Sequence, residues 1–129
     1  MKALVLNSGI GSRMGDLTKD TPKCMVKIKD NETILSRQLK MLKKNNVEDI
    51  VMTTGYLEDK IIDYIKELSI YKNINYVYNN RYNEVNYIYS IYLAREYLND
   101  DILLMHGDLV FDEKVLYMIL NSDRSVMAV

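Results

Sequence analysis

Residues 3–11 read Ala-Leu-Val-Leu-Asn-Ser-Gly-Ile-Gly, an apolar run that passes directly into a glycine-containing turn. A short, continuous apolar run of this kind is typical of a strand buried on both faces. Glycines placed after such a strand let the backbone turn tightly and approach a ligand closely. The stretch therefore predicts a buried first strand with a glycine loop at its carboxyl end.

Helix-like segments alternate with strand-like segments along the rest of the chain. Apolar residues recur at helical spacing over residues 33–46, 58–68 and 112–120, the last with Asp112 as its N-cap. Tyr87, Ile91, Ala94 and Leu98 share one face of a further helix. Short apolar or β-branched runs predict strands over residues 49–54, 74–78, 102–105 and 125–129. This order favours an α/β sandwich with a largely parallel sheet, forming one domain over residues 1–129.

Composition excludes several classes of protein. The chain has 129 residues, of which 48% are hydrophobic and 27% charged, so a real core is expected and disorder is not. Its 17 basic and 18 acidic residues balance, which argues against nucleic acid as a partner. A single cysteine, Cys24, cannot form an internal disulfide and reads as a small buried residue. The first apolar run is too short for a signal peptide or membrane span, so we expect a cytoplasmic protein without membrane contact.

The glycine loop after the first strand suggests an anion-binding site. Arg13 adds a fork of donors that suits a phosphate. The dinucleotide-binding fingerprint fails because Met14 stands at its third glycine, and because residues 53–55 offer no acidic side chain at the second strand end. The P-loop fails because Gly11 is followed by Ser12 and Arg13 rather than by lysine. A tight turn with Arg13 on the surface remains the alternative.

A second motif, Thr21-Pro22-Lys23, makes the anion-binding interpretation more specific. Proline fixes the backbone before Lys23 and would direct the ammonium group toward the glycine loop. The combined pattern Gly9-x-Gly11-Ser12-Arg13-Met14, then Thr18, then Thr21-Pro22-Lys23 is far more specific than any of its parts.

This combined pattern resembles the signature of the nucleotidyltransferases that join an NTP to a sugar 1-phosphate or a small alcohol phosphate and release pyrophosphate. Gly55-Tyr56 and Gly107-Asp108 agree with it. The segment Asn79-x-x-Tyr82-x-x-x-Asn86-x-x-x-Ser90 is most similar to bacterial choline-phosphate cytidylyltransferases. The resemblance implies a three-layer α/β/α Rossmann-like nucleotidyltransferase fold. It also implies that these residues are the N-terminal, nucleotide-binding portion of a longer domain.

The resemblance assigns roles to the loop residues. Ser8, Gly9, Gly11 and Ser12 would bind the triphosphate, largely through backbone N–H groups. Arg13 and Lys23 would be the catalytic cations: Arg13 would stabilise the leaving pyrophosphate, and Lys23 would offset the repulsion between the α-phosphate and the attacking phosphate.

Three further residues are candidates with open alternatives. Asp108 is the candidate Mg²⁺ ligand, because a carboxylate at a strand end suits this cation, although a turn-forming role is the alternative. Asn86 and Ser90 would contact the base or ribose, whereas Asn86 could instead only cap a helix. His106 is interpreted as a strand side chain, because this reaction requires no catalytic base.

The expected function is Mg²⁺-dependent transfer of CMP from CTP to a small phosphorylated acceptor such as phosphocholine. A sugar 1-phosphate acceptor is one alternative. A nucleotide-binding fragment that does not catalyse the reaction is the other, because no residue here clearly supplies a second metal-binding carboxylate.

Overall fold

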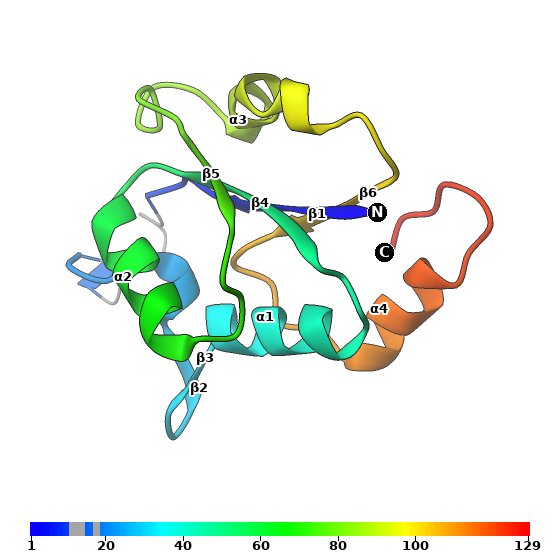
Figure 1. Ribbon diagram of the computed structural model, residues 1–129. Helices are drawn as coiled ribbons and strands as arrows, with labels where there is room; N and C mark the ends of the chain where they lie inside the picture. The colour runs from blue at the N-terminus through cyan, green and yellow to red at the C-terminus, as the bar shows by residue number, and fades with distance from the viewer. Residues whose placement is uncertain (11–14, 17–18) are drawn as a thin grey trace.

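The computed structural model describes residues 1–10, 15–16 and 19–129, and a parallel sheet lies at its centre (Figure 1). The strands stand in the order β5-β4-β1-β6 and every neighbouring pair is parallel. Their bounds are β1 Lys2–Asn7, β4 Asp49–Thr54, β5 Asn75–Tyr78 and β6 Ile102–His106. The largely parallel sheet expected from the sequence is confirmed.

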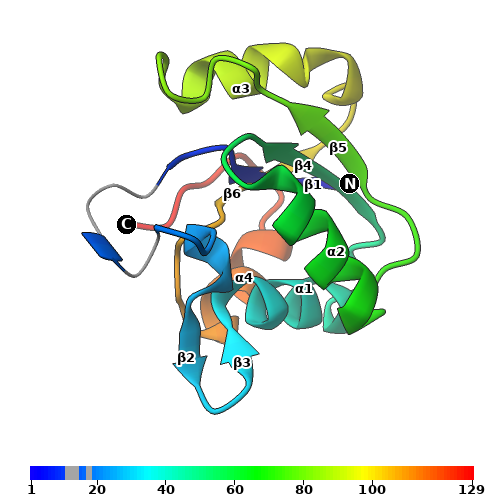
Figure 2. The ribbon, with the colours of Figure 1, turned by 90° about the vertical axis from the view of Figure 1, so that its left-hand side faces the viewer.

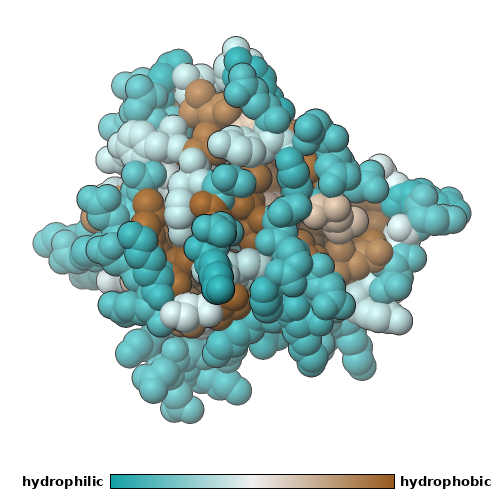
Figure 3. All heavy atoms as spheres, in the orientation of Figure 1, coloured by the Kyte–Doolittle hydropathy of each residue, from teal (hydrophilic) through white to brown (hydrophobic). Residues whose placement is uncertain are grey.

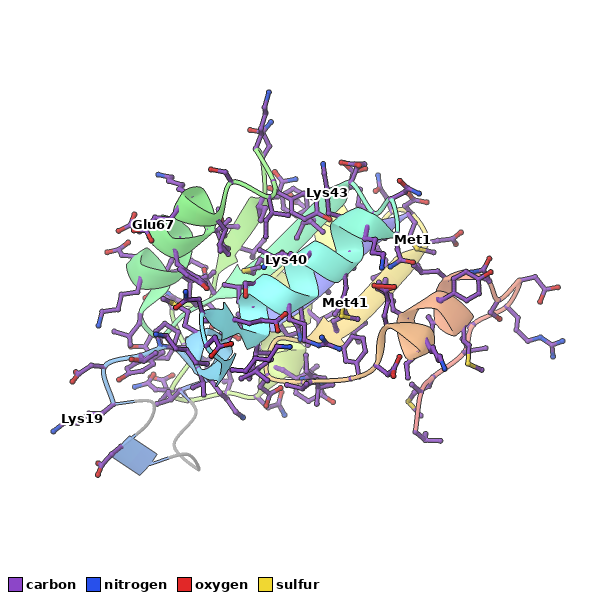
Figure 4. All side chains as sticks on the ribbon, turned by 90° about the horizontal axis from the view of Figure 1, so that it is seen from below. Met1, Lys19, Lys40, Met41, Lys43 and Glu67 are labelled. Atoms are coloured by element: carbon purple, nitrogen blue, oxygen red, sulfur yellow. The ribbon has the colours of Figure 1, made fainter. Side chains whose placement is uncertain are left out.

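Helices cover both faces of this sheet, which gives the three α/β/α layers implied by the family resemblance. One face carries α1 (Ile34–Lys44), α2 (Glu58–Leu68) and α4 (Glu113–Leu120), with α1 between the other two (Figure 4). The opposite face carries α3 (Tyr87–Leu93), followed by the 3-10 helix η3 (Arg95–Tyr97) (Figure 1). None of the described helices is long and apolar enough to cross a membrane.

Strand β1 separates two apolar cores because its side chains alternate between the two faces. Ala3 and Val5 face the lower core, defined here as the cluster beneath the sheet that includes Leu35, Leu39 and Met52. On the other side, the upper core beneath α3 consists of the buried side chains of Leu4, Leu6, Val51 and Ala94. The brown apolar patches of Figure 3 are separated by hydrophilic side chains on the face shown.

Local hydrogen bonds explain where the helices begin and end. Thr33 and Ser36 form a reciprocal capping box at the start of α1, and Asn45 ends that helix. The Asp112 side chain accepts a hydrogen bond from the Lys114 N–H at the start of α4, which confirms its predicted N-cap role. Glu58 and Asp59 occupy the first turn of α2, where negative charge is favourable.

Two predictions of secondary structure were wrong. Residues 125–129 form no strand, and Val126 and Met127 are exposed, because apolar composition cannot hold a strand without a neighbour to accept its backbone hydrogen bonds. The predicted helix through Leu98 is shorter, because α3 ends at Leu93 and tightens into η3. The structure also contains a small hairpin that the sequence did not predict, β2 (Lys27–Lys29) with β3 (Glu32–Thr33), which projects beyond the sheet (Figure 2).

The order of the strands reverses direction at β1. The chain moves from β1 to β4 and β5 on one side, and then returns to β6 on the other side of β1. Ligands of open α/β sheets bind beyond the carboxyl ends of the strands at such a reversal of order. The segments that follow β1 and β6 are therefore the first place to look for a site.

The lower core generates the first prediction. Leu39 is fully buried there, and Leu39→Ala should lower the free energy of unfolding by about 2–5 kcal/mol because it removes packed atoms and leaves a cavity. Met118→Ala, at a side chain with 71% exposure, is the matched control and should change it by less than about 0.5 kcal/mol. Equal effects in urea unfolding would contradict this description of the core.

Candidate functional site

A pocket of about 130 Å³ opens at the carboxyl edge of the sheet, where β1 and β6 end. Asn7, Ser8 and Gly9 line it from the end of β1, and His106 and Asp108 line it from the end of β6. Lys23 lines it from the 3-10 helix η2 (Lys23–Met25). Segments more than 80 residues apart in sequence thus meet at the predicted edge.

Lys23 and Asp108 form an ion pair in this pocket. The Lys23 Nζ lies 2.5 Å from Asp108 Oδ2, and both side chains are about one-third exposed. Burial by itself raises the pKa of Asp108, but the hydrogen bond and the positive charge of Lys23 outweigh burial, so this pKa lies below its ordinary value. The structure therefore brings together the residue predicted to bind phosphate and the residue predicted to bind a metal.

The backbone around Lys23 is fixed on both sides. The Met25 N–H donates to the Pro22 carbonyl at 2.9 Å and the Val26 N–H donates to the Lys23 carbonyl at 3.2 Å, which closes the short helix η2. The Ile34 N–H then donates to the Val26 carbonyl and ties this segment to the start of α1. Pro22 cannot donate a hydrogen bond, and it is buried directly before the lysine.

A buried polar network joins Ser8 to the upper layer. Its hydroxyl lies 2.7 Å from the Ser90 hydroxyl on α3, and the Asn79 Nδ2 donates to the same Ser90 oxygen at 2.9 Å. Ser90 and Asn79 are almost completely buried. The Asn79 N–H also donates to the Thr54 carbonyl, so the network connects the ends of β1, β4 and β5 with α3. Ser90 thus lies close to the site but behind Ser8.

Helix α3 begins at the mouth of the pocket. The Asn86 side chain accepts a hydrogen bond from the Ile88 N–H and caps the helix, which is the alternative role considered for it above. Its contact with a nucleotide stays a prediction. The next residue, Tyr87, meets His106 edge to face with ring centroids 4.9 Å apart, and both rings line the pocket. His106 is a strand side chain, as expected, that also faces the site.

Two glycines allow close approaches at the edge of the sheet. A Cβ atom on Gly107 would lie 1.5 Å from Asn7 Oδ1, and one on Gly55 would lie 2.6 Å from the Tyr82 Cβ. Asn7 Nδ2 is buried and has no hydrogen-bond partner among the residues that the structure describes. Both glycines agree with the motif positions noted in the sequence, and both are needed for packing across the site.

The segment before Lys23 is anchored to α2 and to the loop that precedes it. The Tyr56 hydroxyl donates to the Lys19 carbonyl, and Lys60 donates to the Asp20 carbonyl. Lys19 itself points outward (Figure 4). Gly11, Ser12 and Arg13 lie outside the described residues, so their predicted roles remain predictions.

The polar or aromatic lining residues that sequence reasoning missed are Asn7, Tyr87 and His106, and the remaining unpredicted lining is Leu6, Pro22, Cys24 and Ile61. Asn7 carried a usable signal, because it is the first polar residue after the apolar run of residues 3–6. Tyr87 carried none, because its spacing matched the apolar face of a helix. Cys24, by contrast, is buried as expected, and burial raises the pKa of its thiol to about 12, which removes it as a nucleophile.

Comparison with known protein families identifies the family to which this chain belongs. The family model described as "Nucleotidyl transferase" matches residues 2–125, which is nearly the whole chain. The chain belongs to the nucleotidyl transferase family. This membership confirms the resemblance inferred from the glycine loop and the Thr21-Pro22-Lys23 motif.

Within the nucleotidyl transferase family, the chain is similar to several cytidylyltransferases. It is 34% identical over 115 residues to the choline-phosphate cytidylyltransferase of Haemophilus influenzae, covering 89% of this chain and 47% of the relative. It is 27% identical over 135 residues to the CTP:phosphoglutamine cytidylyltransferase of Campylobacter jejuni, covering 100% of this chain and 52% of the relative. The chain therefore spans about half the length of the curated relatives it matches.

Solved structures of family members agree with the fold. The inositol-1-phosphate CTP transferase of T. maritima superposes with a TM-score of 0.78 at 26% identity, covering 96% of this chain and 49% of that structure. The CTP:phosphocholine cytidylyltransferase of Streptococcus pneumoniae gives 0.73 at 29% identity, covering 83% and 44%. The four-stranded sheet and its layers are thus shared with nucleotidyl transferases.

The contact between Gly107 and Asn7 makes a prediction for stability. Gly107→Ala should lower the free energy of unfolding by about 1–3 kcal/mol, because its Cβ must displace the packed Asn7 amide. The cost should shrink in an Asn7→Ala background, which provides the space. Gly9→Ala is the control, because no described atom lies within 4 Å of its added Cβ. An unchanged cost in the double variant, measured by urea unfolding, would contradict the assigned contact.

The ion pair makes a prediction for pH. Because the pKa of Asp108 is lowered in the folded chain, its contribution is fully present above the ordinary value of 3.8 and is lost as pH falls through the folded value. Asp108→Asn should therefore cost up to about 1 kcal/mol at pH 6 and clearly less at pH 3. The check is urea unfolding at both pH values, and a difference that does not change with pH would refute the contribution of the ion pair.

Proposed function

We propose that this chain holds the nucleotide in an enzyme that transfers CMP from CTP to a small phosphorylated acceptor, such as phosphocholine, and releases pyrophosphate. The observation that carries the proposal is the pairing of Lys23 with Asp108 in the pocket beside the glycine loop. The cytidylyltransferases among its relatives support CTP as the donor. The phosphorylated compounds named for those relatives support the class of acceptor.

The reaction is an in-line attack by a phosphate oxygen of the acceptor on the α-phosphorus of the NTP. Both reactants are anions, so the main tasks are to align them and to reduce their repulsion. Lys23 is the described cation that lines the pocket, and it would lie between the two phosphates. Arg13 would bind the β- and γ-phosphates. Ser8, Gly9, Gly11 and Ser12 would hold the triphosphate.

The donor set at Asp108 suits Mg²⁺. No three His, Cys, Asp or Glu side chains gather into a metal cluster within the described ranges, so these residues do not build an all-protein cage. Mg²⁺ is commonly held by one or two carboxylates together with substrate phosphates and water. The half-buried Asp108 carboxylate in a pocket that would take phosphate fits this pattern. When bound, Mg²⁺ would neutralise phosphate charge and orient the α-phosphate.

The upper layer would contribute to nucleotide binding in two ways. Asn86 is exposed at the start of α3, where it could contact the base or ribose while it caps the helix. Ser90 is buried, so its support for the nucleotide would pass through its hydrogen bond to Ser8. Ser90→Ala would thus act by displacing Ser8.

Pyrophosphate release tests the function directly. The chain is incubated with each NTP, Mg²⁺ and a panel of acceptors that includes phosphocholine and hexose 1-phosphates. Release with CTP and a phosphorylated alcohol supports the proposal, whereas release only with a hexose 1-phosphate supports a sugar nucleotidyltransferase. Calorimetric binding of CTP with Mg²⁺ but no turnover would indicate a nucleotide-binding portion that needs further residues, and no binding would refute the proposal.

Removal of either basic side chain, Lys23 or Arg13, should nearly abolish turnover. Lys23→Ala and Arg13→Ala should each lower the rate by about 10²–10³-fold, because a fixed charge no longer stabilises the transition state. Lys27→Ala is the matched control, since Lys27 is exposed on β2 and does not line the pocket. A variant that keeps more than half of the wild-type rate would refute the role assigned to its residue.

A further inference from the structure

Gln38, in the middle of α1, holds the turn that carries Asp108. Its Nε2 donates one hydrogen bond to the His106 carbonyl at 3.0 Å and another to the Leu109 carbonyl at 2.9 Å. These two carbonyls flank Gly107 and Asp108, so one side-chain nitrogen spans both ends of the turn. Gln38 is only 2% exposed, which keeps water from competing for either bond.

The orientation of this amide is determined by its two acceptors. An amide NH₂ group has two hydrogens, and both are used here. Gln38 Oε1 is buried and, within the described residues, has no hydrogen-bond partner. Rotating the amide by 180° would set that oxygen against two carbonyl oxygens. The residue thus leaves one polar atom unsatisfied, at a cost in free energy, while it secures the turn.

Neighbouring contacts restrict the same segment from three other directions. The Gly107 N–H donates to the Leu6 carbonyl at 2.9 Å, which continues the β1–β6 pairing. The Leu109 N–H donates to the His106 carbonyl at 3.3 Å, which closes the turn on itself. Arg37, beside Gln38 on α1, donates to the Phe111 carbonyl at 3.0 Å. The segment leading from β6 to α4 passes alongside α1 (Figure 1).

We propose that Gln38 is a positioning residue for Asp108, fixing the carboxylate where a metal-bound NTP would meet it. This inference rests on the function proposed above. The reason is geometric: Asp108 lies in a turn outside any helix or strand, and Gln38 holds the backbone carbonyls on both sides of it, in addition to the hydrogen bonds of the turn itself and the ion pair with Lys23. Partners that orient metal-binding carboxylates typically change metal affinity by about 10–100-fold when they are removed.

Gln38→Met tests the proposal, because methionine nearly matches the shape of glutamine and donates no hydrogen bond. Lys40→Met introduces the same side chain at an exposed position of α1 and is the matched control (Figure 4). The chain is saturated with a CTP analogue that cannot be cleaved between its α- and β-phosphates, and Mn²⁺ is titrated in place of Mg²⁺. We expect Gln38→Met to weaken Mn²⁺ binding by about 10–100-fold and Lys40→Met to leave it unchanged.

Backbone hydrogen exchange without nucleotide gives an independent reading. In Gln38→Met, the amides of Gly107 and Leu109 should exchange at least about tenfold faster than in wild type, while the amides of β4 should not change. A folded Gln38→Met variant with wild-type exchange in the turn, or with Mn²⁺ affinity within threefold of wild type, overturns the proposal. If Gln38→Met exchanges fast in the turn but the wild-type chain binds no nucleotide, the proposed function is overturned, and with it the link between Gln38 and a metal.

The wild-type chain provides a further test that does not depend on a folded variant. If the Gln38 amide and the nucleotide site are coupled, the Nε2 hydrogens should exchange severalfold more slowly with the CTP analogue and Mg²⁺ bound than with the analogue alone. Equal rates would overturn the proposal.

Discussion

The carboxyl end of β1 is hydrogen-bonded on both of its edges, and the positions of the pocket residues depend on this double pairing. Leu6 is paired with Thr53 of β4 on one side and with His106 of β6 on the other. The next residue, Asn7, packs against Gly107, and Ser8 reaches α3 through Ser90. A parallel strand buried on both faces cannot slip by one residue without reversing its buried side chains. The residues at the carboxyl ends of β1, β4 and β6 are therefore held in one fixed alignment, and the pocket residues that follow β1 and β6 are fixed with them.

Helix α1 couples the stability of the lower core to the position of the ion pair. Its apolar side packs Leu35, Leu39 and Leu42 beneath the sheet. Its first residue, Ile34, is hydrogen-bonded to the segment that carries Lys23, and its buried Gln38 is hydrogen-bonded to the turn that carries Asp108. Both members of the ion pair are thus supported by the same rigid element, and a rigid element can hold a site more accurately than a loop can.

The sequence was most informative where burial imposes a period. Residues 49–54 and 58–68 form β4 and α2 with the predicted bounds, because a strand buried on both faces and an amphipathic helix each leave a clear pattern. Residues 125–129 have the composition of a strand, but composition does not supply the neighbour that a strand requires. Sequence pattern alone thus predicts a strand or helix correctly where a neighbouring element is present for it to pair with or pack against.

The site was less predictable than the fold, for a different reason. Lys23 and Asp108 were identified by motif, and the sheet topology explains why they meet although 84 residues separate them. For Ser90, the motif could not reveal that its hydroxyl is bonded to Ser8 and Asn79 behind the pocket. Gln38 resembles any polar residue on a helix until the two carbonyls it holds are seen. Hydrogen-bond partners across the fold leave no period in the sequence.

The ion pair also determines how the proposed substrates must bind. Lys23 and Asp108 neutralise one another, so a phosphate that takes Lys23 alone would leave Asp108 beside an anion in a partly buried pocket. Repulsion between the phosphate and the Asp108 carboxylate is unfavourable, and this repulsion falls when a metal cation takes the place of the Lys23 ammonium group at Asp108. Under the proposed function, nucleotide and metal would therefore favour one another's binding, and by thermodynamic linkage each would raise the other's affinity by the same factor. Lys23 holds the pKa of Asp108 below its ordinary value, which favours the ionised carboxylate that this exchange of partners requires.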